Sequence, residues 1–375
     1  MKQKIIANTF ATVFAIALSL LVVPMAQAEI LIGQTAGFTG PTAAAMKEIN
    51  EGASLYFDAV NKKGGIKGEQ VKMVSLDDKF DAALALQNAK ELVEKQNVLA
   101  LFLSRGTSQT EAVLPVLAQN GVALVAPSTG AMSLHDPVNP HVFNVRAPYQ
   151  NESSRSILQL ASSGLTKVAV IYRDDGFGKD GMAGADKGFA SAKLKPLFVE
   201  KVDKTKADFA GAIAKAVALN PQAILIIEAP ATTARAVHEL RASGVKSQVI
   251  TLSNCASTGF VKALGPHARG VMVSQVFPGE HASALPMINE LLVLAKARKV
   301  DVSPATMEGF AAAKVLVAAL QSIKGSPNRA SLISALDSMQ RVDLGGLTLS
   351  FSPANHTGLS FVDLSIIGYD GKFKR

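Results

Sequence analysis

The sequence has one cysteine, no tryptophan and 18% charged residues among its 375. A single cysteine, Cys255, excludes a scaffold of intrachain disulfides. Charge of either sign is not strongly in excess, with 38 Lys and Arg against 30 Asp and Glu. Basic residues are scattered among acids and no tryptophan offers a stacking surface, which argues against a nucleic-acid partner. Because 48% of the residues are hydrophobic, the composition excludes a disordered chain and allows about two domains.

Long apolar runs are also scarce, and the one present lies at the N-terminus. Lys2 and Lys4 precede an apolar stretch over 10–23, and Ala26-Gln27-Ala28 follows it. A basic start, a short apolar stretch and an A-x-A end are the parts of a secretory signal peptide. The alternative is an uncleaved membrane anchor. We predict a signal peptide over 1–28, cleaved after Ala28, and a periplasmic mature protein.

From Glu29 onward, short apolar runs alternate with amphipathic stretches. The expected strands cover 30–32, 71–76, 98–103, 122–126, 167–172, 223–227, 248–251 and 270–276. The expected helices cover 43–61, 82–95, a stretch from 108, 153–162, 181–192, 208–219 and 232–243. Repeated βα units predict parallel sheets covered by helices on both faces. Two successive sets of such units predict an α/β protein with two similar lobes.

After Val276 the pattern changes to helices at 286–297, 304–322 and 328–339, then strands at 347–351 and 361–369. Asp370-Gly371 is a strong hairpin signal. No linker rich in Pro, Ser or Gly separates the lobes, so ordered crossings are expected near Val145, Val276 and Gly346. This places 29–146 with 279–345 in one lobe and 147–278 with 346–375 in the other. Such an arrangement favours a hinge and a cleft.

One stretch, Gly176 to Gly181, matches the G-x-G-x-x-G pattern of dinucleotide-binding folds. Arg173, Asp174 and Asp175 separate it from the preceding strand, and the carboxylates of Asp174, Asp175 and Asp180 would crowd the place of a pyrophosphate. A nicotinamide-dependent dehydrogenase is therefore the weakest of the functional alternatives.

Other catalytic signatures are missing from the sequence. It contains no P-loop, no G-x-S-x-G, and no metal-binding spacing among its six histidines. Cys255 is interpreted as a small apolar filler. We expect no enzyme activity, no cofactor and no metal.

Hydroxyl-rich turns follow two neighbouring strands, at Ser104 to Ser108 and at Pro127 to Ala131. Ligands of open α/β sheets bind beyond the carboxyl ends of the strands. Thr107 and Ser128, with the free N–H groups of the next helix, would suit a carboxylate. Plain helix capping explains the same residues equally well, and Ser108 to Glu111 fits a capping box.

The order of several motifs resembles the solute receptors of branched-chain amino-acid ABC importers. They are Gly37-Phe38-Thr39-Gly40-Pro41, Asn61-Lys62-Lys63-Gly64-Gly65-Ile66-Lys67-Gly68, Leu76-Asp77-Asp78, Ala126-Pro127-Ser128-Thr129-Gly130-Ala131, Tyr172-Arg173-Asp174-Asp175-Gly176-Phe177-Gly178, Phe361-Val362-Asp363-Leu364 and Gly368-Tyr369-Asp370-Gly371. The resemblance covers nearly all of the mature chain. It implies a type I periplasmic binding protein, with two Rossmann-like lobes, a three-segment hinge and a ligand held between closing lobes.

The resemblance also assigns site residues. The carboxylate role falls on Thr107, supported by Ser128 and by the backbone of Thr129 and Gly130. Phe177 matches an aromatic that covers the ligand, and the neighbouring glycines would shape the turn that presents it.

Three positions depart from the family pattern: Ala45 and Ala229 replace aromatics, and Ser253 stands where an acid usually holds the ligand's ammonium. An ammonium buried without a carboxylate is costly, so Glu228 or Asp175 would have to substitute. Otherwise the ligand lacks an α-amino group. Arg105, beside the carboxylate turn, is either a ligand contact or a surface residue.

The expected function is an exported receptor of an ABC importer that acts as a monomer with a permease and ATPase in the inner membrane. Its ligand is a small carboxylate: a branched-chain or other amino acid, or an aromatic or aliphatic acid. A sensor built on the same fold is the alternative from another class. Genes for a permease and an ATPase beside this one would favour transport.

Overall fold

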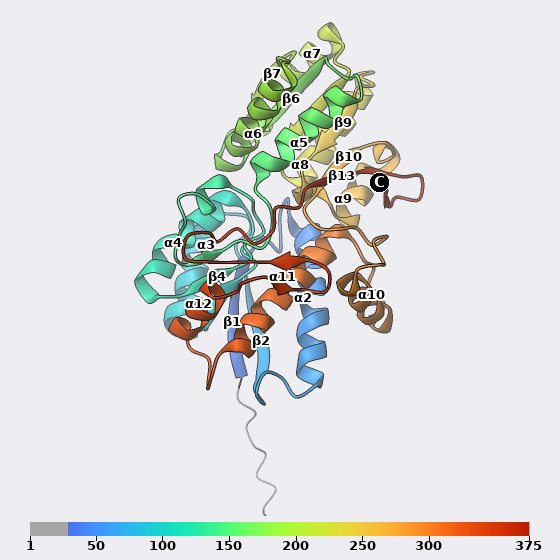
Figure 1. Cartoon of the computed structure of the whole chain (residues 1–375). Coiled ribbons are helices and arrows are strands. Elements are labelled where there is room, and N and C mark those ends of the chain that lie inside the picture. Colours follow the sequence, from blue (N-terminus) through green and yellow to red (C-terminus); the bar gives the residue numbers. More distant parts are fainter. Residues whose placement is uncertain (1–28, 375) are drawn as a thin grey trace, which may run out of the picture.

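The computed structural model describes residues 29–374, which form two lobes stacked end to end (Figure 1). The predicted signal peptide, 1–28, lies outside the described residues. Each lobe contains one large β-sheet. None of the helices between Glu29 and Lys374 has the length and apolar character needed to cross a bilayer.

The first lobe is built on a parallel five-stranded sheet. Its strands are β1 (Glu29–Ala36), β2 (Gln70–Asp77), β3 (Ala100–Phe102), β4 (Ala123–Val125) and β5 (Val142–Phe143). They lie in the order β2-β1-β3-β4-β5, and every pair is parallel. The helices of this lobe are α2 (Ala43–Lys62), α3 (Ala82–Lys90), α4 (Thr107–Asn120), α10 (Pro286–Arg298), α11 (Pro304–Ser322) and α12 (Arg329–Asp337).

The second lobe has a larger, mixed sheet. Its strands are β6 (Val168–Arg173), β7 (Val199–Val202), β8 (Ala223–Ile227), β9 (Gln248–Thr251), β10 (Met272–Gln275), β13 (Asp363–Ile367) and β14 (Phe373–Lys374). The order is β14-β13-β10-β9-β8-β6-β7, with antiparallel pairing only where β13 joins β10 and β14. Its helices are α5 (Tyr149–Ser162), α6 (Gly176–Ala192), α7 (Ala210–Leu219), α8 (Pro230–Ala242) and α9 (Thr258–Leu264).

The central strand β8 shows why the sheets are covered on both faces. All five of its residues are buried. Ile224 and Ile226 pack into one apolar cluster, whereas Leu225 and Ile227 pack into another on the opposite face. A strand whose two faces both need covering favours parallel βα units with helices on either side. The predicted α/β fold is confirmed.

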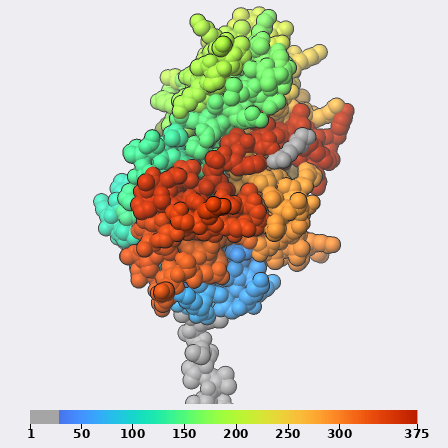
Figure 2. All heavy atoms as spheres, in the orientation of Figure 1, coloured from blue at the N-terminus to red at the C-terminus, as the bar shows by residue number. Residues whose placement is uncertain are grey.

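The C-terminal part of the chain returns to the first lobe before it reaches the second. Figure 2 shows these orange and red segments over much of the visible face. A small hairpin of β11 (Val342–Asp343) and β12 (Thr348–Leu349) comes before the chain crosses from the first lobe to the second for the last time. Leu349, Phe351 and Leu359 belong to the core of the first lobe. The third crossing therefore lies beyond Leu359, later than the predicted boundary at Gly346.

Two local predictions are wrong. The capping box expected at Ser108 does not form, because α4 begins one residue earlier, at Thr107, with Gly106 as its N-cap. The glycine pattern from Gly176 lies inside α6 and not in a turn before it. A Cβ at Gly184 would meet the backbone of Gln150 at 2.4 Å, so glycine there allows α6 to pack closely on α5.

Candidate ligand-binding site

A cavity lies between the lobes, where the carboxyl ends of strands from both sheets face each other. Its lining residues are Thr42, Phe80, Arg105, Gly106, Thr107, Gln109, Ser128, Tyr149, Arg173, Asp175, Phe177, Ala229 and Asn254. Its volume is about 20 Å³, room for little more than one water molecule. The lobes must therefore separate to admit an organic solute.

Arg105 supplies the positive charge of the first lobe to this cavity. Its side chain is buried; Nη1 donates to Ser128 Oγ at 2.8 Å and Nη2 to the carbonyl of Asn254 at 2.9 Å. An arginine has five N–H donors in a planar fork, so these two bonds leave three N–H groups of Arg105. The sequence left Arg105 either on the surface or at the ligand. The structure shows that it is buried and lines the cavity.

Thr107 and Ser128 both reach the cavity from the hydroxyl-rich turns. The Thr107 hydroxyl lies 2.9 Å from that of Thr129, which is fully buried. Gly106, the N-cap of α4, has no side chain that could accept from the first N–H groups of the helix, which begins at Thr107. Unpaired N–H groups at a helix start favour an anion there. Gly130 does not line the cavity; its carbonyl accepts from the N–H of Tyr149 at 2.7 Å.

Arg173, at the end of β6, brings a second guanidinium to the cavity from the second lobe. Its Nε donates to Asp175 Oδ2 at 2.6 Å, and its Nη1 lies 3.6 Å from Glu228 Oε2. Asp175 also accepts from the N–H of Gly178 at the start of α6. That carboxylate occupies the helix terminus where a pyrophosphate would bind, which argues further against a dinucleotide site.

Glu228 lies behind Arg173 and does not line the cavity. Its side chain is fully buried, and Oε2 accepts from the N–H of Ala229 at 2.8 Å. Burial raises the pKa of Glu228 to about 7, against the opposing effect of Arg173. Glu228 therefore faces Arg173 through Oε2, whereas its Oε1 has no hydrogen-bond partner within residues 29–374.

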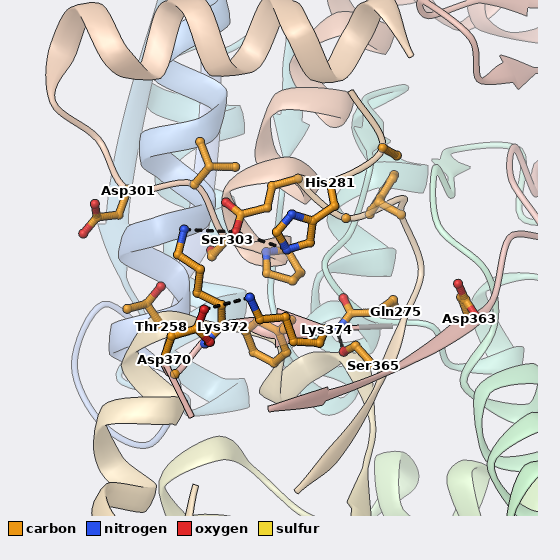
Figure 3. A pocket seen from close by; sticks show the side chains of 18 of the residues that line it. Thr258, Gln275, His281, Asp301, Ser303, Asp363, Ser365, Asp370, Lys372 and Lys374 are labelled. Atoms are coloured by element: carbon orange, nitrogen blue, oxygen red, sulfur yellow. Dashed lines mark hydrogen bonds and ion pairs between the residues drawn. The ribbon is translucent and has the colours of Figure 1, made fainter. Parts of the chain in front are cut away.

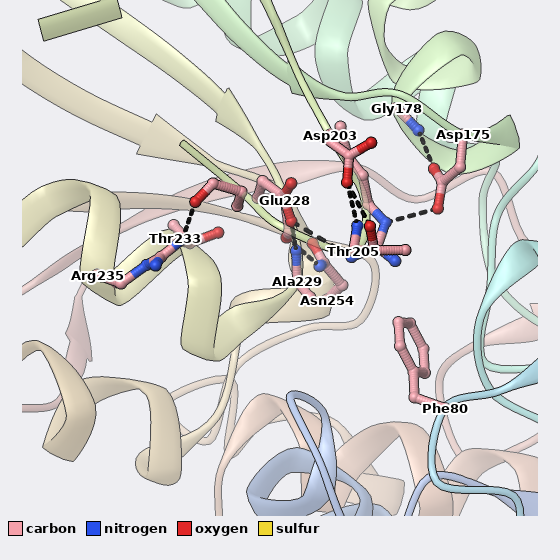
Figure 4. Close-up of polar contacts among 12 residues, drawn as sticks. Phe80, Asp175, Gly178, Asp203, Thr205, Glu228, Ala229, Thr233, Arg235 and Asn254 are labelled. Atoms are coloured by element: carbon pink, nitrogen blue, oxygen red, sulfur yellow. Dashed lines mark hydrogen bonds and ion pairs between the residues drawn. The ribbon is translucent and has the colours of Figure 1, made fainter. Parts of the chain in front are cut away.

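Phe80 closes the cavity from the first lobe. Figure 4 shows its ring directed toward the second-lobe group of Asp175, Glu228 and Asn254. The Arg173 guanidinium carbon lies 5.5 Å from the ring centre of Phe80, a cation–π contact across the cleft. Phe80 has a φ of 61°, which L-residues rarely adopt.

Hydrogen bonds hold the loop of Phe80 in this unusual conformation. Asp78 Oδ1 accepts from the N–H of Phe80 at 2.8 Å, and Gln109 Nε2 donates to its carbonyl at 2.6 Å. Burial raises the pKa of Asp78 to about 6. The loop after β2 is thus built to direct an aromatic ring into the cleft.

Phe177 and Tyr149 form an aromatic wall on the side of the second lobe. Their ring centres are 4.9 Å apart in an edge-to-face arrangement. Phe177 lines the cavity, as expected from the sequence, but a different local structure holds it there. The first turn of α6 holds it, not a glycine turn.

Ser253 serves the hinge and does not line the cavity. Its hydroxyl accepts from Arg146 Nη2 at 2.7 Å, and its N–H donates to Glu152 Oε2 at 2.9 Å. Arg146 and Glu152 are themselves a buried ion pair, and Glu308 of α11 lies 3.9 Å from Arg146. The neighbouring Asn254 lines the cavity in its place.

Further contacts join the lobes in this closed arrangement. Glu48 of α2 accepts from the N–H groups of Thr258 and Gly259 at 2.9 and 2.7 Å, at the start of α9. The N–H of Ala231 donates to the carbonyl of Pro41. Glu48 therefore acts as a cap supplied by one lobe to a helix of the other.

The charges of the lining favour an anion. Arg105 and Arg173 face one acid, Asp175, which is already paired with Arg173. The surplus positive charge lies on Arg105, beside Thr107 and Ser128. A carboxylate can take charge-assisted hydrogen bonds there, and the aromatic side chains can cover an apolar body.

Arg173, Phe80 and Tyr149 were not among the site residues expected from the sequence. Arg173 and Phe80 carry a signal, since each lies at or just beyond the carboxyl end of a strand. Tyr149 carries no such signal, because it begins a helix in a segment that crosses from one lobe to the other.

Comparison with known proteins agrees with this architecture. The periplasmic binding protein family matches residues 29–362. The chain is 25% identical over 330 residues to Leu/Ile/Val-binding protein homolog 3 of Brucella melitensis biotype 1, covering 87% of this chain and 88% of that protein.

Two crystal structures are similar over nearly the whole chain. A substrate-binding periplasmic protein from Ralstonia solanacearum is 31% identical with a TM-score of 0.85, covering 92% of this chain and 99% of that one. An extracellular ligand-binding receptor from Verminephrobacter eiseniae is 29% identical with a TM-score of 0.83, covering 93% and 100%. The chain therefore belongs to the periplasmic binding protein family, as a type I solute receptor related to the Leu/Ile/Val-binding proteins.

Proposed function

We propose that this receptor delivers a small monocarboxylate, with an apolar and preferably aromatic body, to an ABC importer. Thr107, Ser128 and Arg105 hold the carboxylate, and the rings of Phe80, Tyr149 and Phe177 cover the body. The ligand needs no α-amino group. The observation that carries the proposal is the guanidinium of Arg105, buried in the lining with three donors to spare.

The acids near the cavity support the absence of an ammonium subsite. Asp175 pairs with Arg173 and with the start of α6, and Glu228 pairs with Arg173 and its own loop. Ser253 lies in the hinge network. A ligand ammonium at Asp175 would compete with Arg173 for that carboxylate and would leave the Arg173 guanidinium, whose side chain is only 11% exposed, less well compensated.

Binding proceeds through lobe closure. The two lobes separate at the hinge, the carboxylate docks on the first lobe, and Arg173 and Phe177 close over it. The ligand shifts the population toward the closed form by its added contacts in that form. A membrane permease then recognises the closed receptor, which works as a monomer.

The ligand class is tested with protein purified from the periplasm of an expressing bacterium. Thermal shift and calorimetry compare leucine with 4-methylpentanoate, which has the same skeleton without the ammonium, and benzoate with the neutral benzamide. Ligands that bind the folded state raise the melting temperature. We expect 4-methylpentanoate or benzoate to raise it and leucine and benzamide to leave it unchanged. Stabilisation by leucine alone contradicts the proposed ligand class.

Transport is tested separately from binding. A strain that lacks this gene should lose high-affinity uptake of the radiolabelled acid that binds, and the wild-type gene should restore it. Normal uptake in the deletion strain, with a lost transcriptional response to the acid, would favour the sensor.

A further inference from the structure

The second lobe carries only positive charge in the loops at the amino edge of its sheet. The parallel strands point their carboxyl ends at the cleft, so the loops that precede them gather at the opposite edge. The loops before β6, β7, β8, β9 and β10 cover 163–167, 193–198, 220–222, 243–247 and 268–271. They contain no Asp or Glu, and their basic residues are Lys167, Lys193, Lys195, Lys246 and Arg269. We call these five residues the basic rim.

The corresponding loops of the first lobe have balanced charge. The loops before β2, β3, β4 and β5 contain two basic residues, Lys63 and Lys67, and two acids, Glu69 and Asp136. The basic rim is therefore a feature of the second lobe. Its members are spread over about a hundred residues of sequence, and the parallel topology brings them to one edge.

Hydrogen bonds join the loops of the rim into one surface. Gln222 Oε1 accepts from the N–H groups of Thr166 and Lys167, both at 2.9 Å. The carbonyl of Gln222 accepts from the N–H of Gln248 at 2.9 Å, and Gln248 Nε2 donates to the carbonyl of Gly270 at 2.6 Å. Because neighbouring strands lie about 4.8 Å apart, a row of five strands spreads the charges of the rim over about 20 Å.

The charge of the rim is not compensated by acids of the chain. All five residues are exposed, and within residues 29–374 none of them forms an ion pair. The lysines of the C-terminal hairpin differ in this respect. Lys372 pairs with Glu280 at 3.3 Å and Lys374 with Asp370 at 2.7 Å, beside the cavity at the hinge (Figure 3).

Exposed apolar side chains lie beside the rim. Leu219, the last residue of α7, is 46% exposed, and Val217 in the same turn is 57% exposed. Figure 1 shows α7 at the end of the second lobe that lies farthest from the first lobe. Tyr369 is 84% exposed, and the guanidinium carbon of Arg269 lies 3.4 Å from its ring centre. Basic residues next to exposed leucine and tyrosine are typical of proteins that lie on a bilayer interface.

We propose that the basic rim, with Leu219 and Tyr369 beside it, is a docking surface for a bilayer of anionic phospholipid. The lysines approach the phosphate groups, and the apolar side chains enter the interface between headgroups and acyl chains. The cleft lies at the opposite ends of the same strands, and no residue of the rim lines it. A docked receptor therefore keeps its cleft clear of the bilayer, and docking concentrates the receptor at the membrane surface.

A purely structural role explains only part of the pattern. Lys193 is the C-cap of α6, where a cation stabilises the helix end. That role explains neither the absence of acids from all five loops nor the exposure of Leu219. The experiments therefore measure bilayer binding and melting temperature separately.

The first test is sedimentation of the periplasmically purified receptor with vesicles of phosphatidylcholine, alone or mixed with an equal amount of phosphatidylglycerol. Each basic residue near an anionic surface strengthens binding about fivefold, so five residues predict half-maximal binding at about 0.3 mM lipid in low salt. Binding should require phosphatidylglycerol and should disappear at about 1 M salt, where the screening length falls to about 3 Å. Absence of binding to the anionic vesicles, or equal binding to both kinds, would overturn the proposal.

Two double variants locate the surface. Lys195→Gln with Lys246→Gln removes two charges of the rim and should weaken vesicle binding about 25-fold. Lys63→Gln with Lys324→Gln removes the same charge from exposed positions of the first lobe and should bind as the parent does. Equal weakening in both would show that only net charge matters and would overturn the proposal. A lower melting temperature of the rim variant, with unchanged vesicle binding, would assign the rim to helix capping alone.

Leu219→Ser distinguishes a bilayer from an acidic protein. Loss of an apolar side chain from the interface should weaken vesicle binding about tenfold. Tighter binding of soluble polyglutamate than of anionic vesicles, with no effect of Leu219→Ser, would identify an acidic protein as the partner and overturn the bilayer. None of these tests needs a cleft ligand, so failure of the carboxylate proposal leaves their outcomes unchanged.

Discussion

Arg105 of the first lobe donates to the backbone carbonyl of Asn254 in the second lobe at 2.9 Å. The same guanidinium is bonded to Ser128, so one side chain connects the carboxylate turn to the opposing lobe. In the binding mode that we propose, a carboxylate bound to Arg105 would meet both lobes at one point, and this contact would couple recognition of the acid to closure.

Removal of Arg105 should abolish this coupling. We expect Arg105→Met to weaken binding of the stabilising acid by about 10- to 100-fold, because a hydrogen bond to a charged group contributes about 1.5–3 kcal/mol. Arg105→Lys should recover part of the affinity through charge without the planar fork. Calorimetry measures both, with Arg155→Met, an exposed arginine of α5, as the control. Equal affinity in Arg105→Met and the control would remove Arg105 from the site.

Thr107 should affect both affinity and stability. Thr107→Ala weakens acid binding about tenfold through the lost hydroxyl. It also leaves the fully buried Thr129 hydroxyl without the partner that it has at 2.9 Å, which costs about 1–3 kcal/mol of unfolding free energy. In a double-mutant cycle, Thr107→Ala with Thr129→Ala should cost less stability than the two single changes added together. Additive losses in urea unfolding would contradict a direct hydroxyl pair.

Glu228 should give the receptor a stability that falls as pH rises. Burial raises the pKa of this carboxyl to about 7 from 4.5, so between these values the folded state holds a proton that the unfolded state has lost. The free energy of unfolding therefore decreases across that window. Glu228→Gln removes the decrease and should gain up to about 3 kcal/mol over the parent at pH 8, relative to pH 4.5.

Urea unfolding at pH 4.5, 6 and 8 measures this difference. Glu239→Gln, on the surface of α8, should follow the parent at every pH. Parallel curves for the parent and Glu228→Gln would show that the carboxyl titrates normally.

Two substitutions of Phe80 should separate the effect of its backbone strain on stability from the effect of its ring on ligand binding. Both Phe80→Ala and Phe80→Gly lose the ring over Arg173 and should weaken binding of an aromatic acid by a similar factor. At a φ of 61°, glycine avoids a strain of about 1–2 kcal/mol that alanine keeps. Phe80→Gly should therefore melt at a higher temperature than Phe80→Ala. The reverse order of melting temperatures would show that the loop relaxes in the variants.

The hinge pair should be sensitive to the loss of one charge. Glu152→Gln leaves the buried guanidinium of Arg146 without its full counter-charge and should cost about 3–5 kcal/mol of unfolding free energy. Glu91→Gln, in the exposed pair with Lys95, is the control and should leave the unfolding midpoint unchanged. A similar small effect of both changes would mean that water reaches the hinge pair.

The sequence by itself determined the fold class and the region of the site. Runs such as the five buried residues of β8 need covering on both faces, which parallel βα units supply. Parallel strands then bring their carboxyl ends, and with them Thr107 and Ser128, to one edge of the sheet. These inferences depend on the spacing of apolar residues along the chain and on the direction of the strands. Both follow directly from the order of the residues.

The tertiary structure alone decided which side chains meet across the cleft. Arg105 and Asn254 are 149 residues apart, and sequence analysis leaves Arg105 either on the surface or at the ligand. Ser253 was expected beside the ligand, yet its hydroxyl is taken by Arg146 in the hinge. The partners of these polar groups are set by how the two lobes pack against each other. Burial then requires each group to find a partner among the residues that docking brings near.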